Sequence, residues 1–264
     1  MKNKKLILDI ILIAFISPIL ILMVWTVASR WTYPNLIPTE YSLRGFEYIL
    51  NTENIKVLIN SLYISFIVVF ISIIISIPAA KAIAIYEFKG KKLFELLVLS
   101  PIIVPMISVA MGIHIVFLRQ GIANSIIGVI IINILPCIPY SVKMIADVYK
   151  LVGDKLELQA KVLGANSFNT FRYITLPLIF PGIIGASSMC FIISFSQYFL
   201  TMLIGGGNVI TYPMIMFPYI QSGDRTIASL YSLVFLIVSI IVLILVEGKI
   251  KKNYINNKSN SFLG

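Results

Sequence analysis

The segment that decides the fold is residues 157–183, "ELQAKVLGANSFNTFRYITLPLIFPGI". It lies between two long apolar runs, is polar over its first half, contains Gly164 and reaches a Leu-Pro pair at residues 176–177. A connection between two membrane helices needs only a few residues. The length and ordered pattern of this segment therefore indicate a structured element with a function of its own.

The composition predicts a membrane protein. The chain has 264 residues, of which 59% are hydrophobic and 12% charged, and its mean hydropathy is +0.97. A soluble domain carries about 25% charged residues, and the apolar runs here are long enough to cross about 30 Å of hydrocarbon as helices. We predict an all-α integral membrane protein with six transmembrane helices, at residues 6–27, 58–80, 96–118, 126–142, 178–200 and 226–246.

The basic residues predict the orientation, because cytoplasmic loops carry an excess of Lys and Arg. If the N-terminus is cytoplasmic, sixteen of the 21 Lys and Arg residues lie inside, and five lie outside: Arg30, Arg44, Lys56, Arg119 and Arg225. Both termini are therefore predicted to be cytoplasmic. This topology and the attraction to anionic lipid account for the net charge of +10. The sequence offers no basic module outside the membrane, which argues against nucleic-acid binding.

The first run resembles a signal peptide in its basic start and in the small residues near Ala28. Its apolar stretch is longer than the roughly 7–15 residues usual there, and further runs follow, so we expect a retained helix. Cys137 and Cys190 lie within apolar runs and are interpreted as small packing residues. Pro101 and Pro105 predict a kink or an irregular start in the third run. Residues 28–57 are predicted to form a partly ordered outer loop, and residues 205–218 a flexible or re-entrant segment.

Residues 154–163 read as a short helix. Asp154 is predicted to cap its start, with Glu157 as the partner in a capping box, and Gly164 to end it in the left-handed conformation. Leu156, Ala160 and Leu163 recur at helical spacing and form one apolar stripe.

A second short helix is predicted to follow, with Ser167 as its cap and Pro177 as its end. The apolar stripe of the first helix needs a surface to cover it. It can lie on the lipid interface, or it can fill a groove on a soluble partner. The fixed corner at Gly164 favours a partner, because a helix that lies on lipid needs no such corner.

Polar uncharged residues occur within two predicted spans. Asn133 lies in the fourth, and Ser187, Ser194 and Gln197 lie near one helical face of the fifth. The serines either hold helices together or line a water-filled path, and the sequence leaves both open. For Gln197 we favour the path, because packed helices rarely satisfy all the hydrogen-bonding sites of an amide.

The segment resembles the "EAA" loop of binding-protein-dependent ABC importer permeases, which have a MetI-like transmembrane domain. That family shows Glu-Ala-Ala-x-x-x-Gly followed by an Ile-x-Leu-Pro ending. Alignment on Gly164 places Leu158, Gln159 and Ala160 at the three named positions and keeps Leu163 and Ala165 beside the glycine. The acidic residue is displaced by one position, to Glu157. "ITLP" (174–177), "NSL" (60–62), "LVLSPIIVP" (97–105), "GGGNVITYPMIMF" (205–217) and "SGDRTIASLYS" (222–232) also resemble family segments.

The resemblance implies three parts. Residues 1–57 would form an N-terminal transmembrane helix and an extracytoplasmic segment, and residues 248–264 a basic cytoplasmic tail. Residues 58–247 would form the permease core, with a cytoplasmic coupling loop at 150–177. The chain would be a multi-pass subunit in a bacterial inner membrane.

The resemblance also implies partners. A separate cytoplasmic ATP-binding subunit would dock on residues 154–177, through Glu157, Leu158, Gln159, Ala160, Leu163, Gly164 and Ala165. A second permease, identical or related, would complete the solute pathway, and an extracytoplasmic solute-binding protein would deliver the solute. The sequence contains no Gly-x-x-x-x-Gly-Lys-Ser/Thr loop to cradle phosphates. We therefore expect a non-catalytic subunit without cofactors, driven by contact with its ATPase partner.

The substrate is expected to be a small polar solute. Residues 194–207 most resemble the polyamine (spermidine/putrescine) branch, although Ser196 and Gln197 are neutral where those relatives commonly carry an acid. Ferric iron, thiamine and phosphonate are the alternative substrates. Two other functional classes remain. A stand-alone secondary transporter is disfavoured because the spans lack a mid-membrane charge, and a receptor or assembly factor is disfavoured by the loop pattern.

The topology predicts that Lys161 faces the cytoplasm. A cysteine introduced at this position should react with a membrane-impermeant maleimide only after the membrane is opened. Labelling in intact cells would contradict both the orientation and the proposed role of the loop.

Overall fold

The computed structural model describes residues 2–31 and 34–260, with side chains described for residues 11–31 and 34–246. The chain divides into two compact units. The first joins the chain up to Ile59 with Thr211–Ile241, and the second joins Asn60–Ile210 with the chain from Val242 onward. The segment Thr211–Ile241, expected in the permease core, thus groups with the N-terminal part of the chain.

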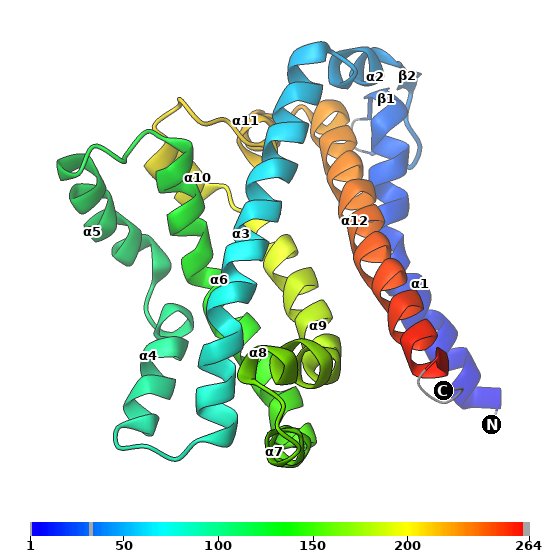
Figure 1. Ribbon diagram of the computed structural model, residues 1–264. Helices are drawn as coiled ribbons and strands as arrows, with labels where there is room; N and C mark the ends of the chain where they lie inside the picture. The colour runs from blue at the N-terminus through cyan, green and yellow to red at the C-terminus, as the bar shows by residue number, and fades with distance from the viewer. Residues whose placement is uncertain (1, 32–33, 261–264) are drawn as a thin grey trace. The chain divides into compact units, whose positions relative to one another are not determined.

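The first unit contains one long helix, a small sheet, two short helices and the N-terminal parts of two further helices (Figure 1). Helix α1 (Lys2–Val27) leads into two antiparallel strands, β1 (Ala28–Arg30) and β2 (Glu40–Tyr41), in which Ala28 pairs with Tyr41 and Arg30 with Glu40. Helix α2 (Arg44–Ile49), the start of α3 (Thr52–Ile85), α11 (Tyr212–Ser222) and the first turns of α12 (Arg225–Asn260) complete it. Tyr212, Ile227 and Tyr231 form its buried core.

The second unit carries most of the helices. They are the remainder of α3, α4 (Lys91–Ile103), α5 (Met106–Arg119), α6 (Ile126–Val152), α7 (Lys155–Val162), α8 (Ser167–Thr170), the π-helical turn η1 (Phe171–Thr175), α9 (Leu176–Phe195) and α10 (Phe199–Gly205). Helices α6 and α9 run side by side (Figure 1) and form the most extensive contact between elements.

Small residues allow α6 and α9 to approach closely. A Cβ atom added at Gly182 of α9 would lie 3.2 Å from the Cα atom of Ile145 and 3.2 Å from the carbonyl oxygen of Met144, both on α6. The thiols of Cys137 and Cys190 are buried in the same contact, and each lies near the carbonyl oxygen of the other cysteine. Close backbone approach at small residues is the usual way in which helices associate in lipid. The predicted packing role of the two cysteines agrees with this arrangement.

Helix α3 packs through a line of small hydroxyl residues. Ser61, Ser65, Ser72 and Ser76 are all buried and lie on one helical face. The hydroxyl of Ser76 is hydrogen-bonded to that of Ser141 on α6 at 2.5 Å. Such bonds between spans satisfy polar groups that lipid cannot.

The helices confirm the all-α membrane fold and refine the predicted spans. Four described helical stretches are long and apolar enough to cross a membrane, and they match the second, fourth, fifth and sixth predicted spans: Thr52–Ile85, Ile126–Val152, Ser167–Phe195 and Arg225–Val246. The first predicted span corresponds to α1, which is apolar over the searched residues Ile11–Val27.

The third predicted span is not one continuous helix. Helices α4 and α5 meet at an angle of 100°. Val104 has extended backbone angles (φ −86°, ψ 136°) because the ring of Pro105 excludes the helical conformation from the preceding residue. Pro105 thus breaks the helix as the sequence indicated, whereas Pro101 lies within α4.

Two segments around residue 200 differ from the prediction. The fifth span ends at Phe195 rather than at residue 200, and the backbone leaves the helix at Ser196–Tyr198 before α10 begins. Residues 205–218, predicted to be flexible or re-entrant, contain the end of α10, a turn and most of α11. Two consecutive glycines, Gly206 (φ +54°) and Gly207 (φ +83°), make this turn possible.

Gly206 gives a test of the fold. A Cβ atom at this position would lie 1.8 Å from Oδ1 of Asn124, whereas a Cβ atom at Gly207 would meet open space. Both glycines have positive φ, so both alanine variants carry a similar backbone strain of about 1–2 kcal/mol. We expect Gly206→Ala to lower the melting temperature of the purified chain in detergent clearly more than Gly207→Ala. Equal losses in the two variants would contradict the described packing of the turn.

Candidate functional site

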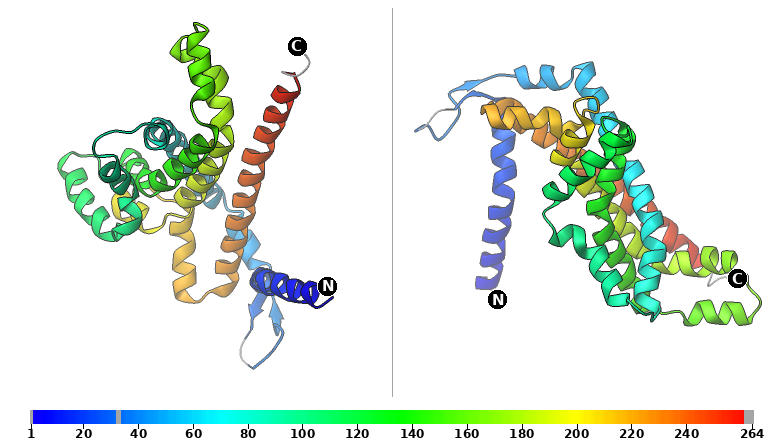
Figure 2. Two further views of the ribbon diagram at one scale, coloured as in Figure 1. Left: turned by 90° about the horizontal axis from the view of Figure 1, so that it is seen from below. Right: turned by 90° about the vertical axis from the view of Figure 1, so that its left-hand side faces the viewer.

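Helix α7 lies beyond the end of α6 and beside the segment that leads into α9 (Figures 1 and 2). Two glycines in the left-handed half of backbone space, Gly153 (φ +69°) and Gly164 (φ +87°), flank it. At its end, the amide of Gly164 donates to the carbonyl of Lys161, and the amide of Ala165 donates to that of Ala160, both at 3.0 Å. This is a Schellman motif. The predicted role of Gly164 as the left-handed end of the helix is therefore confirmed.

The predicted cap at the start of α7 is wrong. Asp154 occupies the N-cap position, but its side chain accepts no capping hydrogen bond. Glu157 does not complete a capping box either, because its carboxylate has stronger partners elsewhere in the chain.

The carboxylate of Glu157 joins three elements. Its Oε2 atom lies 2.5 Å from Nζ of Lys81 on α3, and its Oε1 atom accepts a hydrogen bond of 2.6 Å from the hydroxyl of Thr175 on η1. Only 10% of the Glu157 side chain and 24% of the Lys81 side chain are exposed. We call Lys81, Glu157 and Thr175 the α7 clamp, because their side chains join α7 to α3 and to η1.

The surroundings of Glu157 favour its ionised form. Burial alone raises the pKa of this carboxyl, but the hydrogen bonds from Lys81 and Thr175 and the charges of Lys81 and Lys161 outweigh burial. The net result is a pKa below the ordinary value. The clamp is therefore a charged one at neutral pH.

Away from the clamp, four aliphatic side chains of α7 and its C-terminal end are exposed, beside the polar Lys155 and Gln159. The exposed fractions are 48% for Leu156, 51% for Leu158, 88% for Val162 and 86% for Leu163. We call these four residues the α7 apolar surface. Of the predicted stripe, Ala160 is instead buried, on the same side as Glu157. The prediction grouped Leu156, Ala160 and Leu163 by spacing, but the clamp turns Ala160 inward and leaves the two leucines outside.

The segment after α7 also differs from the prediction. Asn166, not Ser167, caps α8, because its side-chain oxygen accepts from the amide of Asn169 at 2.8 Å. Pro177 does not end this helix. The π-helical turn η1 precedes it, and α8, η1 and α9 continue as one helical stretch from Ser167 to Phe195. A wide π turn provides room that a continuous α-helix denies to a proline ring.

The remaining predicted coupling residues occupy different environments. Gln159 is exposed, Ala165 is half-buried, and the exposed Gly164 meets open space. The structure thus gathers the predicted residues around α7 but divides them between an inward and an outward side. Lys81 and Thr175 were missed. A lone lysine at the end of a long apolar run was the available signal, but only the fold shows which acid it meets.

The predicted pathway residues do not form one group. Asn133 is 1% exposed, and its amide donates to the hydroxyl of Thr201 on α10 at 3.3 Å. Ser194 is buried and Ser187 is half-buried, both on α9. Gln197 is half-buried in the unwound stretch after α9, so it does not share a helical face with the serines. Within the described residues, no group of three or more His, Cys, Asp or Glu side chains is placed to hold a metal ion.

Comparison with known proteins places this geometry in a family. A family model described as "binding-protein-dependent transport system inner membrane component" matches residues 59–248. The chain is 30% identical over 135 residues to the molybdate/tungstate transport system permease protein WtpB of Pyrococcus abyssi, an alignment that spans 51% of this chain and 54% of that relative. It is 21% identical to the putative 2-aminoethylphosphonate transport system permease protein PhnV of Salmonella typhimurium, over 91% of each chain.

Two further similarities extend the comparison. The spermidine/putrescine transport system permease protein PotC of Haemophilus influenzae is 22% identical over 81% of this chain and 83% of its own length. A solved bacterial ABC transporter involved in the import of the acidic polysaccharide alginate has a similar fold, with a TM-score of 0.70, 17% identity, and coverage of 95% and 94% of the two chains. The resemblance seen in the sequence is confirmed. The chain belongs to the family of binding-protein-dependent transport system inner membrane components, the MetI-like permeases of ABC importers.

Proposed function

We propose that this permease subunit couples to a separate ATP-hydrolysing subunit through residues 154–177. The observation that carries the proposal is the combination of an exposed apolar surface and a charged clamp on one short helix. The α7 apolar surface offers a partner a hydrophobic patch, while Lys81, Glu157 and Thr175 tie the helix to the rest of its unit. Family membership supports the proposal, since ABC importer permeases work with ATPase and solute-binding partners.

The α7 apolar surface suits a groove on a soluble protein. Val162 and Leu163 are almost fully exposed, at 88% and 86%. Exposed apolar side chains on a short helix are suited to a hydrophobic groove on a partner protein. The Schellman motif at Gly164 fixes the direction in which these side chains point.

The α7 clamp would make α7 move as one rigid body with the helices to which it is bonded. A force applied to α7 by its partner reaches α3 through Lys81 and reaches η1 and α9 through Thr175. Only two non-helical residues, Gly153 and Asp154, separate α7 from the end of α6 at Val152. Movement of the partner would thus move the spans that flank α7, as in rigid-body alternating access.

We further propose that the chain forms the solute pathway with a second permease, identical or related, in a bacterial inner membrane. Of the predicted pathway residues, Ser187 and Gln197 are the two with partly exposed side chains. Gln197 lies in unwound backbone, which at membrane depth is tolerated where it lines a cavity or is buried in protein. Asn133 and Ser194 are buried within the chain and more readily support its packing.

The proposed substrate is a small polar solute delivered by an extracytoplasmic solute-binding protein. The relatives are named for molybdate/tungstate, 2-aminoethylphosphonate and spermidine/putrescine. A polyamine-like solute is the first candidate, and phosphonate, ferric iron and thiamine are alternatives. Uptake into vesicles that contain the assembled transporter, with each solute competing in turn, identifies the substrate. Uptake by the purified chain alone would instead support a stand-alone secondary transporter.

Docking is tested on the α7 apolar surface. Leu163→Glu should weaken co-purification of the ATPase subunit at least about tenfold, or about 1.4 kcal/mol, because it places an unpaired charge in an apolar interface. The matched control is Leu36→Glu, because Leu36 is 92% exposed but lies in the predicted outer segment. If Leu163→Glu still bound the ATPase subunit normally, the α7 apolar surface would not be part of the interface.

The corner of the loop is tested at Gly164. Gly164→Pro should abolish the association with the ATPase, because proline cannot adopt φ near +87° and cannot donate the hydrogen bond to Lys161. Gly90→Pro is the control, since Gly90 also has positive φ (+90°), meets open space and lies in another predicted cytoplasmic loop. Unchanged co-purification of Gly164→Pro would argue strongly against the loop as the docking site.

The α7 clamp is tested by separating docking from coupling. Glu157→Gln removes the charge of a buried side chain, so we expect normal ATPase binding but a drop of about tenfold in solute-stimulated ATP hydrolysis, which corresponds to about 1.4 kcal/mol. Glu87→Gln is the control, because Glu87 also pairs with a lysine but its side chain is 87% exposed.

The same variant predicts a pH effect. Because the pKa of Glu157 is lowered in the folded chain, its stabilisation is present above the ordinary carboxyl pKa and is lost as the pH falls below that value. The stability difference between wild type and Glu157→Gln should therefore shrink as thermal melts are recorded at increasingly acid pH. A difference that stays constant with pH would contradict a charged clamp.

A further inference from the structure

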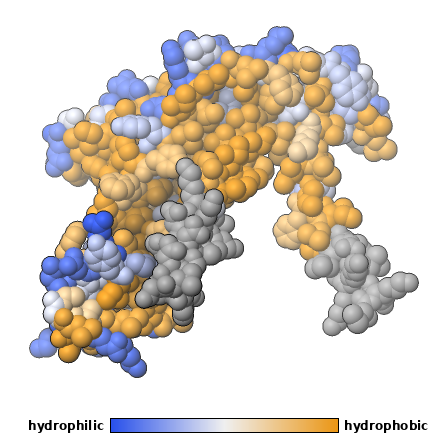
Figure 3. Space-filling view, turned by 45° about the vertical axis from the view of Figure 1, so that its right-hand side comes forward, coloured by the Kyte–Doolittle hydropathy of each residue, from blue (hydrophilic) through white to orange (hydrophobic). Residues whose placement is uncertain are grey.

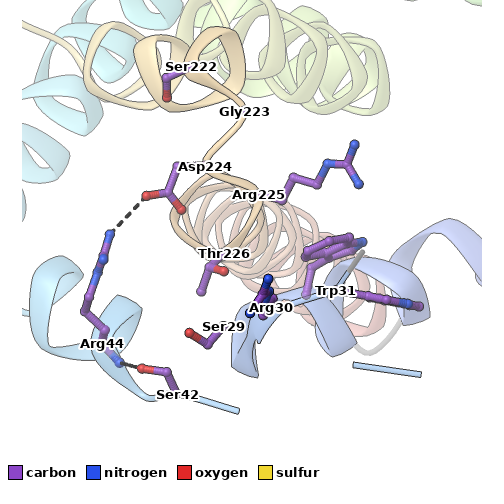
Figure 4. A pocket seen from close by; sticks show the side chains of 11 residues that line it. Ser29, Arg30, Trp31, Ser42, Arg44, Ser222, Gly223, Asp224, Arg225 and Thr226 are labelled. Atoms are coloured by element: carbon purple, nitrogen blue, oxygen red, sulfur yellow. Dashed lines mark hydrogen bonds and ion pairs between the residues drawn. The ribbon is translucent and has the colours of Figure 1, made fainter. Parts of the chain in front are cut away.

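The first unit contains an open cavity of about 890 Å³. It lies where the end of α1, the β1–β2 sheet, the start of α2 and the α11–α12 junction meet (Figure 4). Two hydrogen bonds fix the backbone of Arg30 at the edge of the cavity: the amide and the hydroxyl of Thr39 both donate to the carbonyl of Arg30 at 3.0 Å. The hydroxyl of Thr226 donates to the carbonyl of Ala28, which ties α12 to β1.

Positive charge dominates the cavity lining. Arg30, Arg44 and Arg225 all line it, against a single lining carboxylate, Asp224. Arg44 is paired with Asp224 at 3.1 Å (Figure 4). The guanidinium groups of Arg30 and Arg225 have N–H donors that are not used in a close ion pair. Arg30 approaches Glu40 only at 3.8 Å, with both side chains largely exposed, and Arg225 forms no ion pair with any described residue.

The chemistry of these groups points to a phosphate ester. A guanidinium group presents a planar fork of donors that matches the oxygens of a phosphate. Ser29, Ser42 and Ser222 add hydroxyl groups to the lining, which suit an uncharged polar headgroup such as glycerol. A choline headgroup would instead bring a cation toward the arginines.

Two tryptophan rings indicate that the cavity lies at the level of the membrane surface. Trp25 and Trp31 line it with their ring centroids 4.8 Å apart, and the guanidinium of Arg225 lies 5.1 Å from the ring of Trp25. Tryptophan residues gather at the level of the lipid headgroups. In the predicted topology this is the outer interface, at the end of α1 and the start of α12.

Helix α1, which ends at the cavity, exposes apolar side chains along the described part of its length. The described part of α1 presents hydrophobic side chains on the face seen in Figure 3, and Ile13, Phe15, Leu20 and Met23 are between 50% and 77% exposed. A free phosphate or a soluble protein would leave these apolar side chains of α1 without a matching contact. A phospholipid would lay its acyl chains along them with the phosphate among the arginines.

We propose that this cavity binds the phosphodiester headgroup of an anionic phospholipid such as phosphatidylglycerol. Arg30 and Arg225 contact the phosphate, and Trp25 and Trp31 border the glycerol region. The single negative charge of the bound phosphodiester offsets part of the positive charge of the two arginines, and the lipid holds the outer end of α1 to the sheet and to α12. The inference uses only the first unit and is independent of the proposed coupling through α7.

The two tryptophans supply a local probe, because they are the only ones in the chain and both line the cavity. The full-length chain is reconstituted into phosphatidylcholine bilayers that contain brominated phosphatidylglycerol or brominated phosphatidylcholine at matched low fractions. We expect tryptophan quenching to be stronger with brominated phosphatidylglycerol. In Arg225→Gln and in Arg30→Gln this preference should fall about three- to tenfold, as expected when a charge-assisted hydrogen bond is lost.

Arg119→Gln is the matched control, because it removes a predicted outer arginine that does not line the cavity. It should keep the wild-type preference. The preference is calculated within each variant, so a change in tryptophan emission after loss of the Arg225 stack does not affect it, and helical content by circular dichroism verifies folding.

Four outcomes would overturn the proposal. They are equal quenching by the two brominated lipids, a preference retained in both Arg225→Gln and Arg30→Gln, and a preference lost equally in Arg119→Gln. The fourth is full protection from brominated phosphatidylglycerol by millimolar inorganic phosphate, which would mark a site for free oxyanions. If the arginine variants retain the lipid preference but lose binding of the solute-binding protein, the cavity is part of the receptor surface instead.

Discussion

The close packing of α6 against α9 is the constraint on which the rest of the second unit depends. Two helices in lipid gain little from burying apolar side chains, so they associate where their backbones approach closely. Gly182 and the two buried cysteines make that approach possible. Because α6 and α9 are consecutive spans, their contact brings both ends of the connecting segment together. The connecting segment must therefore fold back on itself, and it does so through the left-handed glycines 153 and 164.

A buried carboxylate then decides which way α7 faces. Glu157 is drawn inward by Lys81 and Thr175, and Ala160 follows because it lies on the same side of the helix. The apolar surface of Leu156, Leu158, Val162 and Leu163 is left outside. In this chain the carboxylate of Glu157 thus makes an internal connection, while the four aliphatic side chains remain exposed. In the proposed coupling, the buried side would position α7 and the exposed side would contact the ATPase subunit.

The first unit uses charge in another way. In the second unit Lys81 is paired with the buried Glu157. In the first unit Arg30 and Arg225 keep hydrogen-bond donors available around an open cavity bordered by two tryptophans. Guanidinium groups are poorly suited to the hydrocarbon but well suited to the phosphate layer above it. A lipid headgroup in this cavity would complete a set of hydrogen bonds that the chain leaves open, and would stabilise the junction of α1, the sheet and α12.

Sequence by itself determined the membrane class, the approximate spans, the break at Pro105 and the end of α7 at Gly164. These depend on local properties: the length of apolar runs, the exclusion of helix before proline and the freedom of glycine at positive φ. Tertiary structure alone decided that Glu157 meets Lys81, that Ala160 turns inward, that Asn133 is buried against Thr201 and that three distant arginines share a cavity. The residues that the fold brings together are separated by up to 195 positions in the chain, as are Arg30 and Arg225, which line one cavity. Helical spacing groups residues on one element, but only packing between elements fixes which of those residues reach each other.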